Sequence, residues 1–237
     1  MEIHRPRPWR GWREFLKEYG IIVLGVLTAL ALEQVVDALR WAHEIGDARQ
    51  ALGREITYNI KALKLIGVQD ACMGQRLDAL RLWAEGSGPR PPEAVRRPIY
   101  YTFETSAWDV ANSGQVVAHF PLDQKLRFAR AYASFDNERN VIAEERDAWQ
   151  TIAAIASEPN LDDGDRRELR HAIGLARTIG PRRRGNAVII LRESPRLAVD
   201  GPGPPLANGP IANPAAFCRA IATAPGRRGL STLGSPS

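Results

Sequence analysis

The sequence predicts an all-α protein, in which an N-terminal transmembrane helix continues into an antiparallel helical bundle outside the membrane. Three observations indicate this fold. Residues 20–32 form an uncharged apolar run behind a basic N-terminus. Apolar residues then recur at intervals of three and four, the period of a helix with one buried face. No proline interrupts residues 10–66.

The apolar run has thirteen residues, fewer than the ~20 that cross a ~30 Å hydrocarbon core. The flanking tryptophans support a longer span. Trp12 and Trp41 are 29 residues apart, or about 43 Å along a helix. This matches the ~40–45 Å between the two interfacial layers, where tryptophan is favoured. We therefore expect a basic leader at residues 1–18 and a transmembrane helix at residues 19–40.

The distribution of basic residues predicts the orientation. Five precede the run, and three follow it in the next 22 residues. The positive-inside rule then places the N-terminus in the cytoplasm and the later domain on the periplasmic side of a bacterial inner membrane. Two alternatives remain open: a signal peptide cleaved after Ala29-Leu-Ala31, and a buried helix of a soluble protein.

Composition bounds the remaining possibilities. A chain of 237 residues holds one anchor and one domain with a proper core. The net charge of +5 is spread as +2 over residues 1–18 and +3 over the rest. Arg182, Arg183 and Arg184 form the only basic triplet. Because phosphate contacts require a clustered basic face, we expect no nucleic-acid partner. Membrane lipid is the expected partner, and Gly25 with Ala29 forms a small-xxx-small pair through which two copies could pack as a homo-oligomer.

The first half of the extramembrane domain, predicted at residues 41–195, carries a helical stripe followed by a second helix. The stripe comprises Trp41, Ile45, Ala48, Leu52, Ile56, Ile60 and Leu63. Leu77, Leu80 and Trp83 predict the second helix, which ends at a Gly/Pro linker at residues 86–92. Residues 99–103 are rich in β-branched and aromatic side chains and could form a short strand, too short to build a sheet.

The second half predicts three more helices. Thr105 or Ser106 can cap a short helix that ends at Gly114. A long helix is expected from Pro121 to Pro159, since proline suits a first helical position. An aspartate cluster at residues 162–165 can cap a further helix, which residues 180–181, Gly-Pro, would break or kink before residues 186–192 resume it. Residues 196–237 predict a Pro/Gly-rich tail with one short helix at about residues 214–222.

Two cysteines, Cys72 and Cys218, are the minimum for one disulfide. An oxidising periplasm permits the bridge, which would contribute about 2–4 kcal/mol. Two unrelated buried thiols are the alternative. The sequence does not choose between them.

Several motifs together resemble a known group of proteins. They are the basic leader, the run from Glu18 to Leu30 with its long following helix, and the segment Ser106-Ala-Trp108 to Ser113-Gly114 ahead of a Leu/Tyr-rich helix. Over about residues 8–155 the chain resembles a bacterial family of single-span membrane proteins with a helical extramembrane domain. That family has no assigned activity, so the resemblance implies an anchor and a helical domain but no chemistry.

The chemical signatures are weak. Glu168-x-x-His171 has the spacing of half a di-iron carboxylate site, but the sequence holds no second copy. Glu144 and Glu145 could supply further carboxylates, and solvated helix faces explain all four residues better. Ser113-Gly114 with nearby His119 is typical of a turn, since no acid partner can be named. We therefore predict no catalytic, cofactor-binding or metal-binding residues and no cofactor.

The sequence favours a membrane-anchored periplasmic binding or scaffold module that self-associates. The alternative is a metal-dependent enzyme with a carboxylate/His site in the bundle. Both rest on fold-level reasoning, because helical bundles host many functions.

Overall fold

The structure, a computed structural model, describes residues 11–91, 97–158, 160–201 and 203. Most of these residues are helical and none of them forms a strand, which confirms the all-α prediction. The elements are α1 (Trp12–Gly67), α2 (Asp70–Ala84), α3 (Ser106–Ser113), the 3₁₀ helix η1 (Val116–His119), α4 (Leu122–Ser157), α5 (Asp163–Glu193) and the 3₁₀ helix η2 (Ser194–Leu197).

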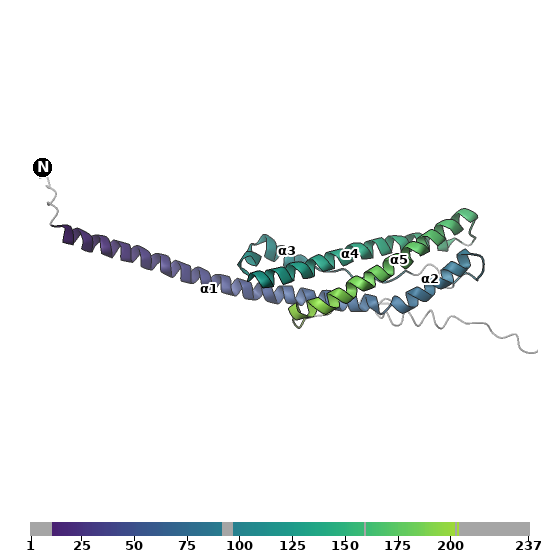
Figure 1. The fold of residues 1–237 in the computed structure, drawn as a ribbon, viewed down its shortest axis with the longest axis horizontal. Coiled ribbons are helices and arrows are strands. Elements are labelled where there is room, and N and C mark those ends of the chain that lie inside the picture. The colour runs from purple at the N-terminus through teal and green to yellow at the C-terminus, as the bar shows by residue number, and fades with distance from the viewer. Residues whose placement is uncertain (1–10, 92–96, 159, 202, 204–237) are drawn as a thin grey trace, which may run out of the picture.

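The longest element, α1, has 56 residues and differs along its length. Its first part projects from the rest of the protein as a single rod (Figure 1). Most side chains there are exposed, and none of its most apolar 18-residue window is buried. From Leu52 onward every third or fourth residue is buried, as the predicted stripe requires. One unbroken helix therefore joins an exposed apolar segment to a packed domain.

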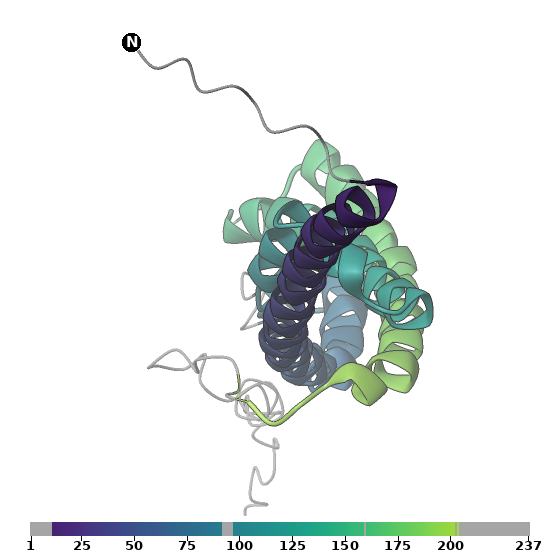
Figure 2. The same cartoon turned by 90° about the vertical axis from the view of Figure 1, so that its left-hand side faces the viewer.

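The remaining helices form an elongated bundle around the second part of α1. Helices α4 and α5 pack against each other along most of their length, and α2 packs on α5 (Figure 1). Seen from the end at which α1 begins, the first part of α1 points toward the viewer, in front of the bundle formed by the other helices (Figure 2). The start of α4 and the end of α5 lie at the end of the bundle nearest the exposed part of α1, which we call the proximal end.

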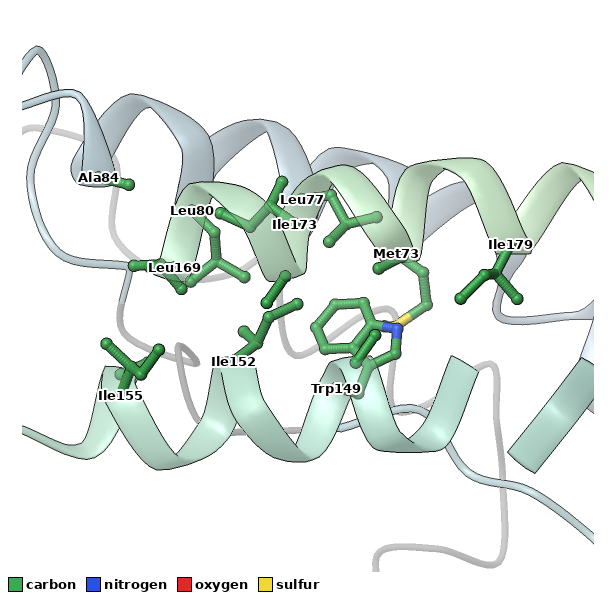
Figure 3. Close-up of a cluster of buried hydrophobic side chains, with 14 of the residues drawn as sticks. Met73, Leu77, Leu80, Ala84, Trp149, Ile152, Ile155, Leu169, Ile173 and Ile179 are labelled. Atoms are coloured by element: carbon green, nitrogen blue, oxygen red, sulfur yellow. The ribbon is translucent and has the colours of Figure 1, made fainter. Parts of the chain in front are cut away.

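Two hydrophobic cores hold the bundle. The distal core joins α2, α4 and α5 around Trp149, which is 1% exposed. Figure 3 shows side chains of all three helices converging there, with Trp149 and Ile152 of α4 facing Ile173 of α5 and Leu77 of α2. The proximal core joins α1, α3, α4 and the end of α5 around Leu52, Ile56 and Phe135. Trp83 and Trp149 are both buried aromatic residues of the distal core.

Residues 99–103 are extended but pair with no strand. Instead, two side-chain amides of α1 and its C-terminal turn bind the segment. Asn59 and the backbone of Glu104 exchange two hydrogen bonds of 2.8 Å. Gln69 and the backbone of Ile99 exchange two of 2.7 Å. The suggested strand was therefore wrong, because side chains rather than a neighbouring strand satisfy these backbone groups.

The helix from residue 106 is confirmed, but its predicted cap is not. Neither Thr105 nor Ser106 caps the backbone of α3 with its own side chain. The carboxylate of Glu55, on α1, accepts hydrogen bonds from the backbone N–H groups of Ala107 (2.8 Å) and Trp108 (3.3 Å). A side chain distant in sequence thus supplies the negative charge that a helix N-terminus favours.

Helix α5 begins as predicted and ends differently. Asp162 and Asp165 form a reciprocal capping box at its start. The helix then continues through Pro181 to Glu193, so the expected break does not occur. Ile179, Arg183 and Ile190 are buried on both sides of the proline. Their packing outweighs the ~3 kcal/mol that an interior proline costs.

Cys72 lies in the distal core and is disulfide-bonded. Cys218, the other cysteine of the sequence, lies outside the described residues, as does the short helix expected at residues 214–222.

Candidate functional site

The candidate binding site is a groove of about 520 Å³ between the proximal halves of α4 and α5 and the 3₁₀ helix η2. We call it the proximal groove. Its residues fall at helical spacing on one face of each helix and are Arg127, Arg130, Ala131, Ala133, Ser134, Asn137, Asn186, Ile189, Ile190, Glu193, Ser194, Arg196 and Leu197. The volume lies in the range of small-molecule sites, roughly 300–1,000 Å³.

Small side chains on α4 create the hollow. Ala131, Ala133 and Ser134 stand where larger residues would fill the space between the helices. Ile190 is buried, whereas Ile189 on the same turn of α5 is 58% exposed. The groove is therefore apolar along its walls and open to solvent.

Contacts with α1 fix the position of the groove relative to the exposed rod. The Tyr132 hydroxyl donates to Glu55 at 2.6 Å, which holds this part of α4 beside α1. The segment after η2 is held by hydrogen bonds from Val199 N to the Gly53 carbonyl (3.3 Å) and from Lys61 Nζ to the Gly201 carbonyl (2.7 Å). Glu55 is 14 residues beyond Trp41, or about 20 Å along the helix.

The groove carries unbalanced positive charge. Arg127 pairs with Asp123, and Glu193 pairs with Arg192 at 3.2 Å. Among the described residues, Arg130 and Arg196 form no ion pair. Two guanidinium groups thus remain to bind an anion at the groove.

A second polar feature lies inside the bundle, where α2, α4 and α5 meet. Arg183, whose side chain is 5% exposed, donates from Nε to Glu145 at 2.8 Å and pairs through Nη2 with Asp70. Burial lowers the pKa of Arg183, but Glu145 and then Asp70 more than offset it, so the net pKa is raised. The arginine therefore stays charged and links three helices.

Glu138 lies near this ion pair and is 0% exposed. Neither carboxylate oxygen has a hydrogen-bond partner among the described residues. The Asn186 amide, which lines the groove, lies beside Glu138 without meeting hydrogen-bond geometry. Burial raises the pKa of Glu138 to about 7, although the positive charge of Arg183 opposes the shift.

The residues of the suggested carboxylate/His site lie on two sides of the helix pair. Glu168 and His171 line a cavity of about 470 Å³ with Glu144 and Asp147 of α4. Glu145 is instead buried, lines the cavity on the Asp70 side and pairs with Arg183, so a solvated helix face was the wrong explanation for this residue. In the described part of the chain, no three His, Cys, Asp or Glu side chains are grouped to hold a metal ion.

Ser113 and His119 do not form a pair either. The Ser113 hydroxyl donates to the Val110 carbonyl at 3.2 Å. The His119 ring stacks on Trp41, with ring centroids 3.7 Å apart. His119 therefore joins η1 to the part of α1 where the membrane interface is predicted.

The sequence predicted neither the proximal groove nor the buried group of Arg183, Glu145 and Asp70, which we call the Arg183 cluster. The charges of residues 182–184 were visible, but they gave no sign that the middle arginine is buried. The helical period of 3.6 residues contains a signal for the buried arginine, because it places Arg183 on the same face of α5 as Ile179 and Ile190.

Comparisons of the chain with protein-family models, with curated proteins and with solved structures find no match. The resemblance to a bacterial single-span family stays a prediction from the motifs quoted above.

Proposed function

We propose that the protein is a membrane-anchored helical binding module. In this proposal the first part of α1 spans a bacterial inner membrane and the bundle lies in the periplasm. The proximal groove is its binding site, and copies associate through α1.

The single observation that carries the proposal is the change of environment along α1. Its first part is long and apolar enough to cross a membrane and is not buried by the rest of the protein. A core helix of a soluble protein would be mostly buried, which argues against that alternative. Contiguous exposure of so many aliphatic side chains is typical of a surface that contacts a membrane or another protein.

The periplasmic location is supported by the five Lys and Arg residues that precede the apolar run. Alkaline phosphatase fused after Asp200 tests it, since the enzyme is active only when exported. High activity is the expected result. An inactive fusion that is expressed at the same level would reverse the orientation.

Carbonate extraction of washed membranes tests the anchor. The full-length protein should stay in the membrane pellet, and intact-mass analysis should find residues 1–40 still attached. Release of the full-length chain would contradict the anchor. A shortened chain that has lost the residues up to about Ala31 would instead establish a cleaved signal peptide.

Self-association through α1 is supported by its exposed first part and by the Gly25 and Ala29 pair within it. Crosslinking in native membranes should trap a dimer or larger species. Substitution of Gly25 and Ala29 by isoleucine should reduce it, because close helix approach requires small residues. Recovery of monomer alone from the unsubstituted protein would refute this part of the proposal.

The enzyme alternative has one supporting observation, the cavity that Glu144 and Asp147 share with Glu168 and His171. Elemental analysis of the purified protein tests it. Stoichiometric metal that is lost in His171→Ala would favour the metal-dependent enzyme. Metal at trace level only would argue against it.

A further inference from the structure

We propose that the proximal groove binds a single-chain amphiphile with a carboxylate head, such as a long-chain fatty acid. The inference rests on the proposed function, because it identifies the ligand class of the same site. Three features of the groove support it.

The first feature is the apolar lining. Ala131 and Ile190 are buried in the groove, while Ile189 remains more than half exposed and Leu197 is half-buried. An aliphatic chain lying between α4 and α5 would remove Ile189 and Leu197 from water, which favours binding. A small polar ligand would leave these side chains hydrated.

The second feature is the charge of the groove. Arg130 on α4 and Arg196 on η2 both line it, and neither has an ion-pair partner among the described residues. Among the described residues that line the groove, Glu193 is the only acidic one, and it pairs with Arg192. Guanidinium groups bind carboxylates through paired, charge-assisted hydrogen bonds. The groove therefore fits one anionic head rather than a neutral or cationic one.

The third feature is location. The groove is lined by the start of α4, the end of α5 and η2, and the first two of these lie at the proximal end of the bundle (Figure 1). Residues next to the groove lining, Tyr132 and Val199, are hydrogen-bonded to residues 53–55 of α1. These residues follow Trp41 by about 20 Å of helix. A bilayer around the first part of α1 would be the nearest source of single-chain amphiphiles. Asn137 and Asn186 supply further hydrogen-bonding groups without adding charge.

The experiment uses the full-length protein in phosphatidylcholine nanodiscs, with laurate as the probe. Displacement of a fluorescent fatty acid measures binding, and empty nanodiscs correct for partitioning into lipid. Laurate should bind saturably and at least about tenfold more tightly than dodecanol. A charge-assisted hydrogen bond between its carboxylate and a guanidinium group contributes at least the free energy of a tenfold change in Kd, which is about 1.4 kcal/mol. Butyrate, which has the head without the chain, should bind weakly.

Two variants test the assignment of the site. Arg130→Gln combined with Arg196→Gln should weaken laurate binding by about tenfold or more and leave dodecanol unchanged. Ala133→Trp should weaken both by filling the groove. The matched control is Arg167→Gln combined with Arg184→Gln, which removes two exposed arginines of α5 that line no part of the groove. It should bind laurate normally.

Equal binding of laurate and dodecanol, or equal loss in the control, would overturn the proposal. So would an absence of saturable binding, and so would an Ala133→Trp variant that changes only the crosslinking pattern, because a second copy would then occupy the groove. Carbonate extraction of the same preparations separates the two proposals. Protein that stays in the membrane but binds no laurate refutes the ligand and leaves the anchored module standing.

Discussion

Single side chains replace expected backbone interactions at several points of the fold. Asn59 and Gln69 each bind both the N–H and the C=O of one residue in the extended segment at residues 99–104. An amide side chain has the same donor and acceptor as a peptide group and can therefore stand in for a strand. This explains why a segment with β-type composition is ordered here without a sheet.

Glu55 is the clearest case of a residue whose role depends on tertiary contacts. Its carboxylate accepts hydrogen bonds from Tyr132 and from the first turn of α3. Burial and the hydrogen bond to Glu55 raise the pKa of Tyr132 above its usual range, so the phenol stays protonated and donates.

We predict that Glu55→Ala lowers stability by about 2–4 kcal/mol, because a charge-assisted cap and a buried hydroxyl partner are lost together. Thermal unfolding followed by circular dichroism in mild detergent measures it. Tyr132→Phe should cost less, about 1–2 kcal/mol, since the carboxylate keeps its backbone donors. An unchanged midpoint in Glu55→Ala would mean that α3 is not held by this contact.

Glu138 gives the molecule a defined pH dependence. Its pKa of about 7 in the folded protein lies above the ~4.3 of an unfolded chain. Between these values the folded state binds more protons than the unfolded state, so stability falls as pH rises. The contribution is fully present below about pH 4.3 and is lost through about pH 7.

We therefore predict that Glu138→Gln becomes progressively more stable than the unsubstituted protein as pH rises from 4.5 to 8, by about 2–3 kcal/mol in total. The difference between the two unfolding free energies at each pH is the readout, because it cancels the other titrating groups. A constant difference across this range would contradict a raised pKa at Glu138.

At the scale of helices, the Arg183 cluster determines how α2, α4 and α5 meet. Its arginine binds Glu145 within the helix pair and Asp70 at the start of α2. The preceding residue of each helix forms a second ion pair. Arg182 of α5 pairs with Glu144 of α4, but these side chains are 51% and 53% exposed. The two pairs differ mainly in burial, which makes one a control for the other.

We predict that Arg183→Met costs about 3–5 kcal/mol, since Glu145 would be left buried and uncompensated. Arg182→Met should cost less than about 1 kcal/mol, as exposed pairs do. Adding Glu145→Met to Arg183→Met should recover most of the loss. Equal effects of the two arginine substitutions on the unfolding free energy would refute the distinction.

Helix α5 also shows how packing overrides a local signal. Residues 180–181, Gly-Pro, predicted a break or a kink, yet α5 continues without a break and is buried before and after Pro181. Proline does disfavour the interior of a helix, but the free energy that it costs is smaller than the free energy gained from the contacts of α5 with α4.

At the scale of the whole molecule, α1 is both an exposed apolar rod and a core helix. A pair of substitutions separates these roles. Leu24 and Leu27 are 66% and 58% exposed on the rod, and Leu82 and Leu175 are 42% and 43% exposed on the bundle. Only the first pair lies in the segment proposed to contact lipid.

We predict that Leu24→Arg with Leu27→Arg shifts the protein out of the carbonate-resistant fraction, because each arginine at the centre of a span costs about 2.5–3.5 kcal/mol. Leu82→Arg with Leu175→Arg should leave the protein in the membrane. The fraction retained in the pellet is the measurement. If both pairs behave alike, the rod is not a membrane anchor.

Most helices could be predicted because their evidence is local. The stripe from Trp41 to Leu63, the aspartates at residues 162–165 and Pro121 each indicate a helix from neighbours in sequence. The candidate site was not predicted, because it has no such local pattern. Arg130 and Arg196 belong to different elements, and only the pairing of α4 with α5 brings them to one groove.

By itself the sequence determined the helical class, the apolar segment near the N-terminus and the main helix starts, since hydrophobic periodicity and capping act within a few residues. Only the tertiary structure decided which charges are buried, which cap comes from a distant helix and where a hollow remains. Those outcomes depend on contacts between residues far apart in the chain, and a buried arginine reads in sequence like an exposed one. Arg182 and Arg183 are adjacent and identical in type, and packing alone gives them different roles.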